Sequence, residues 1–172
     1  PLARVGSELV QAEQGGERMT LARAGWVEAP DEWTRVELNA DLPEDIDPES
    51  LRVRFVTKNE DGHTFKLDDV QAKIAVLANG SFESVGDDGR PRGWVVTPQE
   101  SIRSDEIVKS YDGDNVLAVE SSDEKWTVIA RKLDVEASDL GRKITVAARA
   151  RTPIDRGMFL SVQCTVDGEK QE

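Results

Sequence analysis

The segment His63-Thr-Phe-Lys-Leu-Asp-Asp-Val-Gln-Ala-Lys-Ile74, followed closely by Ala78-Asn-Gly-Ser-Phe-Glu83, carries most of the information about the fold. Polar and apolar residues alternate from Thr64 to Leu67, and the pair Asp61-Gly62 just before them is a turn signal. Alternation with a period of two places successive side chains on opposite faces of a sheet. The segment therefore predicts a β-strand that is entered through a hairpin turn.

The same alternation recurs along the chain, and the expected strands are residues 33–38, 51–56, 115–120, 126–130, 143–147 and 158–166. Turn-forming pairs separate several of them, at 88–89, 112–113, 140–141 and 167–168. Short helical turns are expected at 47–51 and 136–140, a loop at 14–17 and an irregular strand at 5–13. Many short strands at fairly regular spacing predict an all-β fold, an antiparallel β-sandwich of the jelly-roll kind.

The composition of the chain limits the classes of partner that we expect. The chain has 172 residues, enough for one domain or two small ones, and 34 acidic against 22 basic residues give a net charge of −12. Such a field repels phosphate backbones, so we expect no nucleic acid partner. Membrane insertion is not expected either, because no run approaches the ~18–20 apolar residues that a membrane span needs. The start at Pro1, without Met or a signal peptide, suggests a mature or excised segment.

The sequence shows few of the residue patterns that indicate an enzyme. Cys164 is the only cysteine, so we expect no intrachain disulfide, and its alternating run suggests a small core residue. His63, the only histidine, follows a turn and has no evident nucleophile or orienting acid. The glycines at 15–16 lack the Lys-Ser/Thr of a phosphate-binding loop. We therefore expect a protein that is not an enzyme.

From Asn79 onward, the chain resembles the galactose-binding-like jelly rolls of carbohydrate-binding modules, of the type often attached to xylanases and other glycosidases. The residues that carry this resemblance are Asn79-Gly-Ser-Phe-Glu83, Gly93-Trp94, Tyr111–Val119, Trp126 and Gly141–Ala150. What resembles the second half of such a module lies upstream instead, in Trp33–Leu38, Leu42-Pro43, Leu51–Val56 and Asp68-Asp-Val70.

The resemblance implies that the two halves of one module stand in permuted order. Residues 1–76 resemble the C-terminal half and residues 77–172 the N-terminal half, so 63–74 would be the last strand and 78–83 the first. Two arrangements follow. Either both halves fold together within one chain, or a neighbouring chain completes each half by strand exchange, because a half-sandwich exposes unpaired edges. The second arrangement predicts self-assembly, with copies of the chain as partners.

The resemblance also implies a sugar-binding face. Trp126 occupies a position where such modules often carry an exposed stacking aromatic, and Arg149, Arg151 and Gln163 alternate outward on neighbouring strands. An aromatic platform with polar groups around it is what sugar rings require. The aromatic candidates for the platform are Trp26, Trp33, Trp94, Tyr111 and Trp126. We expect Trp126, Arg149, Arg151 and Gln163 to line one face, and Trp33 and Trp94 to be core or rim residues.

Such modules often hold a structural calcium ion between the first and last strands. The matching oxygen ligands here are the carbonyl of Ser81 and the carboxylates of Glu83 and Asp69, with Asp112 as a looser candidate. The alternative is that these carboxylates cap turns or are solvated.

Two functions remain open at this point. The first is a non-catalytic, extracellular or cell-surface module that binds a polysaccharide. The second is a structural subunit of a surface assembly built by strand complementation between neighbours. The resemblance favours the first, while the reversed order and the 5% aromatic content favour the second.

Overall fold

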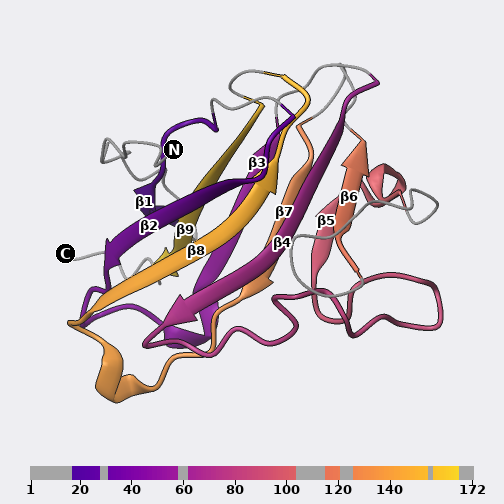
Figure 1. The fold of residues 1–172 in the computed structure, drawn as a ribbon. Coiled ribbons are helices and arrows are strands. Elements are labelled where there is room, and N and C mark those ends of the chain that lie inside the picture. The colour runs from indigo at the N-terminus through magenta and orange to yellow at the C-terminus, as the bar shows by residue number, and fades with distance from the viewer. Residues whose placement is uncertain are drawn as a thin grey trace.

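The computed structural model describes residues 17–27, 31–57, 62–103, 115–120, 126–154 and 157–166. Nine strands run through these residues (Figure 1). Their bounds are β1 Glu17–Arg23, β2 Thr34–Asp41, β3 Arg52–Thr57, β4 Thr64–Lys73, β5 Val95–Thr97, β6 Leu117–Glu120, β7 Val128–Lys132, β8 Lys143–Arg151 and β9 Met158–Val166.

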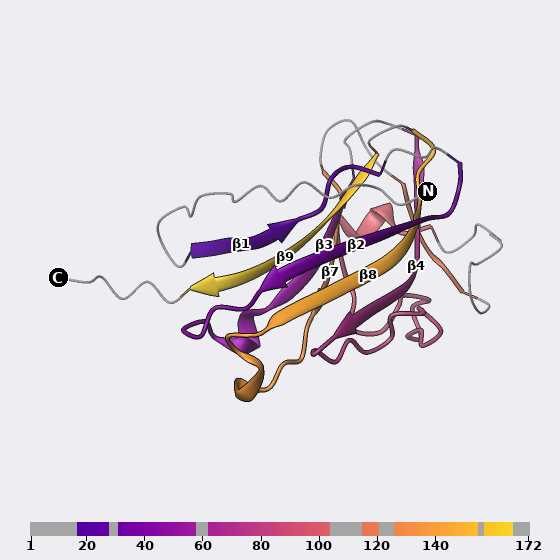
Figure 2. The ribbon, with the colours of Figure 1, turned by 60° about the vertical axis from the view of Figure 1, so that its left-hand side comes forward.

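The strands form two antiparallel sheets that pack face to face, as Figure 2 shows. One sheet has five strands in the order β1-β9-β3-β7-β5, and the other has four in the order β2-β8-β4-β6. The helical elements of the described ranges are single 3₁₀ turns, η1 Pro48–Ser50, η2 Gln99–Ser101 and η3 Ala137–Asp139. The predicted all-β antiparallel sandwich is therefore confirmed, with a connectivity compatible with a jelly roll.

Strands alternate strictly between the sheets along the chain, odd-numbered strands in the five-stranded sheet and even-numbered strands in the four-stranded one. Each sheet therefore contains strands from both halves of the chain. A strand from residues 1–76 lies between two strands from residues 77–172 in each sheet: β3 between β9 and β7, and β4 between β8 and β6. The first and last strands pair with each other, with Glu17 opposite Val166. Within one chain, the two halves thus form a single core; whether neighbouring chains also exchange strands stays a prediction.

The period of two decides which side chains enter the core. In β8, Ile144, Val146, Ala148 and Ala150 are buried between the sheets, while the residues between them face outward or lie under neighbours. The other strands contribute Leu38, Phe55, Phe65, Leu160 and further apolar side chains to the same cluster. Cys164 lies in it with 2% of its surface exposed, as its alternating run predicted.

Most strand predictions are confirmed, with ends shifted by a few residues. The helical turns expected at 47–51 and 136–140 appear as η1 and η3. The strand expected at 78–83 is wrong, because Asn79 and Phe82 have positive φ angles of 56° and 61° and the segment turns. Gly80 is held so close to β4 that an added Cβ would lie 1.8 Å from the Val70 carbonyl oxygen. The irregular strand expected at 5–13 lies outside the described residues.

No helix in the part of the chain that the structure describes is long and apolar enough to cross a membrane.

Candidate ligand-binding face on the five-stranded sheet

The outward side of the five-stranded sheet, here called the five-stranded face, carries the most promising group of side chains. The register of the strands shows which residues lie on this face. Phe159, Val56, Val128 and Thr97 form one row across β9, β3, β7 and β5. Arg23, Ser161, Arg54, Ala130 and Val95 form the next row, and Thr20, Gln163, Arg52 and Lys132 the third.

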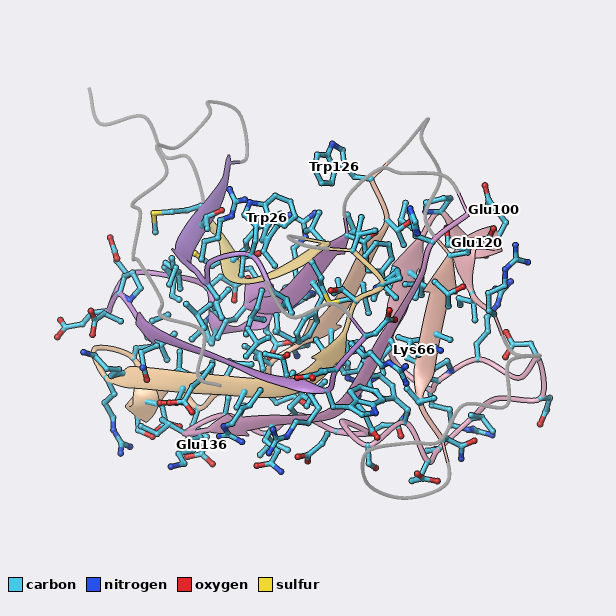
Figure 3. All side chains as sticks on the ribbon, turned by 45° about the horizontal axis from the view of Figure 1, so that its top comes forward. Trp26, Lys66, Glu100, Glu120, Trp126 and Glu136 are labelled. Atoms are coloured by element: carbon cyan, nitrogen blue, oxygen red, sulfur yellow. The ribbon has the colours of Figure 1, made fainter. Side chains whose placement is uncertain are left out.

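An aromatic cluster of Trp26, Trp126 and Phe159 lies at one end of this face. The Trp26 ring is 6.1 Å from that of Trp126, with planes inclined by 31°, and 4.9 Å from that of Phe159, edge to face. Trp126 is 45% exposed, and Figure 3 shows its ring projecting from the molecule beside Trp26, with Glu136 on the opposite side of the view. The cluster therefore presents the accessible ring of Trp126 beside two half-buried rings.

Backbone hydrogen bonds place these rings. Ala24 N and Val27 N donate to the carbonyls of Leu160 and Met158, so the chain follows β9 beyond the end of β1 and brings Trp26 beside Phe159. Thr57 N donates to the Thr127 carbonyl, which sets Trp126 at the end of β3. Trp26 belongs to residues 1–76 and the other two rings to residues 77–172. The cluster thus exists only because the two halves pack together.

Arg23 joins the aromatic cluster to the polar part of the face. Its guanidinium carbon lies 3.8 Å from the centre of the Phe159 ring and 5.5 Å from that of Trp26. Contacts of this kind hold an arginine in place through the negative face of the ring without neutralising its charge.

A chain of hydrogen bonds crosses the face one row further along. Arg54 donates to the side-chain oxygen of Gln163, and Gln163 Nε2 donates to Thr20 Oγ1 at 2.9 Å. Ser161 lies between Arg23 and Arg54 in the ladder, and its hydroxyl is buried without a hydrogen-bond partner among the described residues. Donors and acceptors are therefore fixed beside the aromatic cluster.

An open groove of about 910 Å³ runs over the same strands, lined among others by Arg52, Arg54, Gln163, Val95 and Thr97. Its volume is in the range of known ligand sites. Val128 also lines it, and Val128 shares a row with Val56 and Phe159. The aromatic cluster therefore lies beside the groove.

One edge of the groove is a cluster of charges around Lys132. Its Nζ pairs with Glu49 of η1 and lies 3.2 Å from Asp134 Oδ1. The hydrogen bonds to Glu49, and then to Asp134, raise the pKa of the Lys132 amine above its ordinary value. This lysine is accordingly engaged with carboxylates of the protein.

The structure does not bring the four predicted ligand residues together. Trp126 and Gln163 both belong to the five-stranded face. Arg149 and Arg151 lie on β8, in the other sheet, and point away from the core on the opposite side of the sandwich. The expectation of one shared face is therefore wrong in its geometry, since alternation reveals which residues of a strand face outward but not which sheet contains the strand.

The outward side of the four-stranded sheet, here called the four-stranded face, mixes charges of both signs. Arg35 Nη2 lies 3.1 Å from Glu37, and Lys143 Nζ lies 3.6 Å from Asp41. Asp68 stands opposite Arg149 in the ladder and is fully buried. Trp33, expected as core or rim, is half-buried at the start of β2, whereas Trp94 is buried in the core.

Two of the predicted calcium ligands, Asp69 and Ser81, lie where the two halves meet. Val70 N donates to the Gly80 carbonyl at 2.9 Å, so the backbones of Asp69 and Ser81 flank one hydrogen bond. Asp69 Oδ1 accepts from Gln71 Nε2 at 2.5 Å. Both oxygens of Glu83 accept from Asn115, from its backbone N at 3.0 Å and from its Nδ2 at 2.8 Å. Asp112 lies outside the described residues.

These oxygen atoms are of the type that calcium binds, since two carboxylates and a carbonyl are hard ligands. Among the described residues, no three His, Cys, Asp or Glu side chains gather closely enough to hold a metal ion by themselves. Backbone carbonyls would therefore have to supply much of any coordination there.

Two residues of the five-stranded face escaped the sequence analysis, Arg23 and Phe159, whereas Trp26 was among the aromatic candidates. A signal existed for Phe159, which alternates outward with Ser161 and Gln163 in the run 158–166. For Arg23 the signal was weak, because a register shift between Thr20 and Ala22 interrupts the alternation of β1.

Neither a protein-family model, nor a curated protein, nor a solved structure matches this chain.

Proposed function

We propose that this chain is a non-catalytic carbohydrate-binding module of the jelly-roll kind, which acts outside the cell and holds a polysaccharide on its five-stranded face. The observation that carries the proposal is the aromatic cluster of Trp26, Trp126 and Phe159 beside the groove. Sugar rings have apolar faces that pack on aromatic rings, and hydroxyl groups that need fixed polar partners.

The arrangement of the face supports binding of an extended chain. The aromatic cluster provides the packing surface at one end, and Arg54, Gln163 and Thr20 provide linked donors and acceptors across the strands. The groove is partly open to solvent, which suits a polymer that extends beyond the site. Binding needs no chemical step, and the proposal assigns none.

Calcium enters the proposal as a structural ion. Asp69, Glu83 and the Ser81 carbonyl would hold it where β4 meets the segment 78–83, and the ion would add to the Val70–Gly80 hydrogen bond between the halves. Binding to the folded state alone raises stability by mass action. We expect the unfolding midpoint to rise with added CaCl₂ and to fall with EGTA in the wild type, while the variant Asp69→Ala shows no difference between the two conditions.

Self-assembly is the competing proposal. β1 and β2 are edge strands of their sheets, and an edge is where a strand from a neighbour could add. The pairing of both halves within one chain removes the need for a neighbour to cover an apolar face. We therefore favour the binding module. Light scattering separates the two, since a dilution-independent mass near 19.0 kDa contradicts assembly.

The test is binding to a panel of polysaccharides in affinity gel electrophoresis, with xylan, mannan, galactan, cellulose derivatives and polygalacturonate in the gels. We expect at least one of them to retard the wild type and the double variant Trp26→Ala/Trp126→Ala to migrate freely. Circular dichroism establishes that the double variant is folded. Free migration of the wild type in every gel would contradict the proposed function.

A further inference from the structure

A second, smaller pocket lies next to the groove, at the β5 edge of the five-stranded sheet, and is here called the edge pocket. Its volume is about 310 Å³, and its lining residues in the described part of the chain are 86, 88, 90–96, 99 and 102. Gly93 and Val95 line both the edge pocket and the groove. The two cavities therefore meet at β5, the last strand of the sheet.

Hydrogen bonds fix the loop that forms one wall of the edge pocket. Asn79 Nδ2 donates to the carbonyls of Ser84 and Arg92, at 2.7 Å and 3.2 Å, and Arg92 N donates to the Ser84 carbonyl at 2.9 Å. Gly86 N donates to the Arg90 carbonyl at 2.7 Å, which closes the turn at the tip of the loop. A wall that is formed in advance lowers the entropic cost of binding.

Polar side chains connect this wall to the opposite one. Arg90 Nη1 donates to Gln99 Oε1 of η2 at 3.0 Å, and Arg90 Nε lies 3.7 Å from Asp88 Oδ2. Arg92 Nε donates to the Val85 carbonyl at 2.8 Å. An arginine has more N–H donors than these contacts use, and a carboxylate or amide oxygen accepts more than one hydrogen bond. The lining therefore offers both donors and acceptors to a ligand that carries hydroxyl groups.

Gly93 and Val95 form the boundary between the two cavities. Gly93 has a φ of +75°, and an added Cβ would lie 1.2 Å from Arg131 Nη1, so the guanidinium group of Arg131 lies directly against the backbone. Arg131 Nη1 also donates to the Arg92 carbonyl at 3.1 Å, which ties β7 to the loop. Val95 is 58% exposed. A ligand that leaves the groove over β5 therefore crosses an apolar side chain before it meets the polar lining.

The distance across the sheet sets the length of ligand that could use both cavities. The groove extends from Gln163 on β9 to Val95 on β5, which is three strand spacings, or about 14 Å. The edge pocket begins where this distance ends. A disaccharide bound at the aromatic cluster is too short to reach it, whereas a hexasaccharide is long enough.

We propose that the edge pocket is a second binding subsite, which takes one sugar unit of the polysaccharide held in the groove and recognises it by its hydroxyl groups. This inference rests on the proposed function and adds a subsite to it. A volume of about 310 Å³ is at the lower end of the range of ligand sites and suits a single sugar ring. Arg90, Gln99 and Asp88 supply the hydrogen bonds, and those made by charged groups are the stronger ones.

The test is isothermal titration calorimetry with xylo-, manno-, galacto-, cello- and galacturono-oligosaccharides, each from the disaccharide to the hexasaccharide. In a series that binds, wild-type affinity should rise at least ~10-fold from the shortest oligosaccharide that binds to the hexasaccharide, because the longer ligand gains hydrogen bonds to charged groups. The double variant Arg90→Ala/Gln99→Ala should lose this gain and bind the shortest ligand as the wild type does.

Two further variants separate the subsite from a general effect on the fold. Val95→Arg puts a long side chain between the two cavities and should also abolish the gain with length. Arg142→Ala removes an exposed arginine that pairs with Asp139 of η3, outside both cavities, and should leave both affinities unchanged. Circular dichroism establishes that each variant is folded.

The outcomes separate this inference from the proposed function. Equal losses for the shortest ligand and the hexasaccharide in Arg90→Ala/Gln99→Ala, or no loss for either, overturn the subsite and leave the module function standing. A wild-type affinity that does not rise with length does the same, as does a series that binds only at the hexasaccharide or only as the polymer. Failure of the wild type to bind any polysaccharide of the panel overturns both proposals.

Discussion

The two outward faces of the sandwich use arginine in different ways. On the four-stranded face, Arg35 pairs with Glu37, and Arg149 stands opposite the fully buried Asp68. On the five-stranded face, Arg23 contacts the rings of Phe159 and Trp26, and Arg54 donates to the amide oxygen of Gln163. The first face is distinguished by its ion pairs, and the second by cations beside aromatic rings. Under the proposed function, the four-stranded face is structural and the five-stranded face binds the ligand.

The largest effect expected is on the four-stranded face, for Asp68→Ala. Asp68 is fully buried and its Oδ1 accepts from Asp69 N at 2.7 Å. Leaving a buried backbone N–H without its charged acceptor costs about 1–3 kcal/mol of unfolding free energy, which urea denaturation can measure. Glycan binding by the folded variant should not change. The control is Glu37→Ala, whose surface ion pair contributes under about 1 kcal/mol; equal losses in the two variants would contradict a structural role for Asp68.

A smaller effect, on binding instead of stability, is expected for Trp126→Ala. Its ring is 45% exposed, so removing it costs little core packing but takes away part of the sugar platform. We expect glycan affinity to fall about tenfold, which corresponds to about 1.4 kcal/mol. Trp33→Ala is the matched change on the other sheet and should keep wild-type affinity in calorimetry. An equal loss of affinity in Trp33→Ala and Trp126→Ala would contradict the assignment of binding to the five-stranded face.

Gln163→Ala should weaken binding about threefold, because a lost neutral hydrogen bond is worth about 0.5–1.5 kcal/mol. Gln163 connects Arg54 to Thr20, so its removal frees the guanidinium to adopt other conformations. Arg151→Ala changes a residue that was expected beside Gln163 but lies on the opposite face, and its affinity should equal that of the wild type. An affinity loss confined to Arg151→Ala would assign the ligand to the four-stranded face.

The smallest effect expected concerns alkaline pH. Burial, and then the charge of Asp45, raise the pKa of the Cys164 thiol above 9.0, and the contacts with Glu49 and Asp134 raise the pKa of Lys132 above 10.5. A raised folded-state pKa means stability that is complete below the unfolded value and is lost as pH rises through the folded one. Unfolding free energy should therefore decline above pH 9.0. Cys164→Ala should remove the first part of the decline and Lys132→Met the later part; an unchanged profile in both contradicts these origins.

The sequence was sufficient to predict the sandwich, because alternation is local and survives in most strands. It failed at β5, which has only three residues, and at β1, where a register shift breaks the pattern. The strand expected at 78–83 failed for another reason. Close packing of Gly80 against Val70 and positive φ angles at Asn79 and Phe82 are tertiary features that a short motif does not reveal.

The candidate site could be predicted only in part. Gln163 was predicted because it is a polar residue at an outward position of a regular strand. Trp126 was predicted because it is an aromatic residue next to such a strand. Arg149 and Arg151 satisfy the same criterion but belong to the other sheet. Trp26 meets Trp126 across a hundred residues of sequence, and only the pairing of β1 with β9 brings the two together.

The most direct test of the central claim is a map of amide and indole chemical shifts in ¹⁵N-labelled protein titrated with an oligogalacturonate and, separately, with a xylan-derived hexasaccharide. The account predicts changes concentrated at Trp26, Trp126, Phe159, Arg54 and Gln163 with at least one ligand. Changes concentrated instead at Arg35, Arg149 and Arg151 would contradict the assignment of binding to the five-stranded face, as would the absence of change with both ligands.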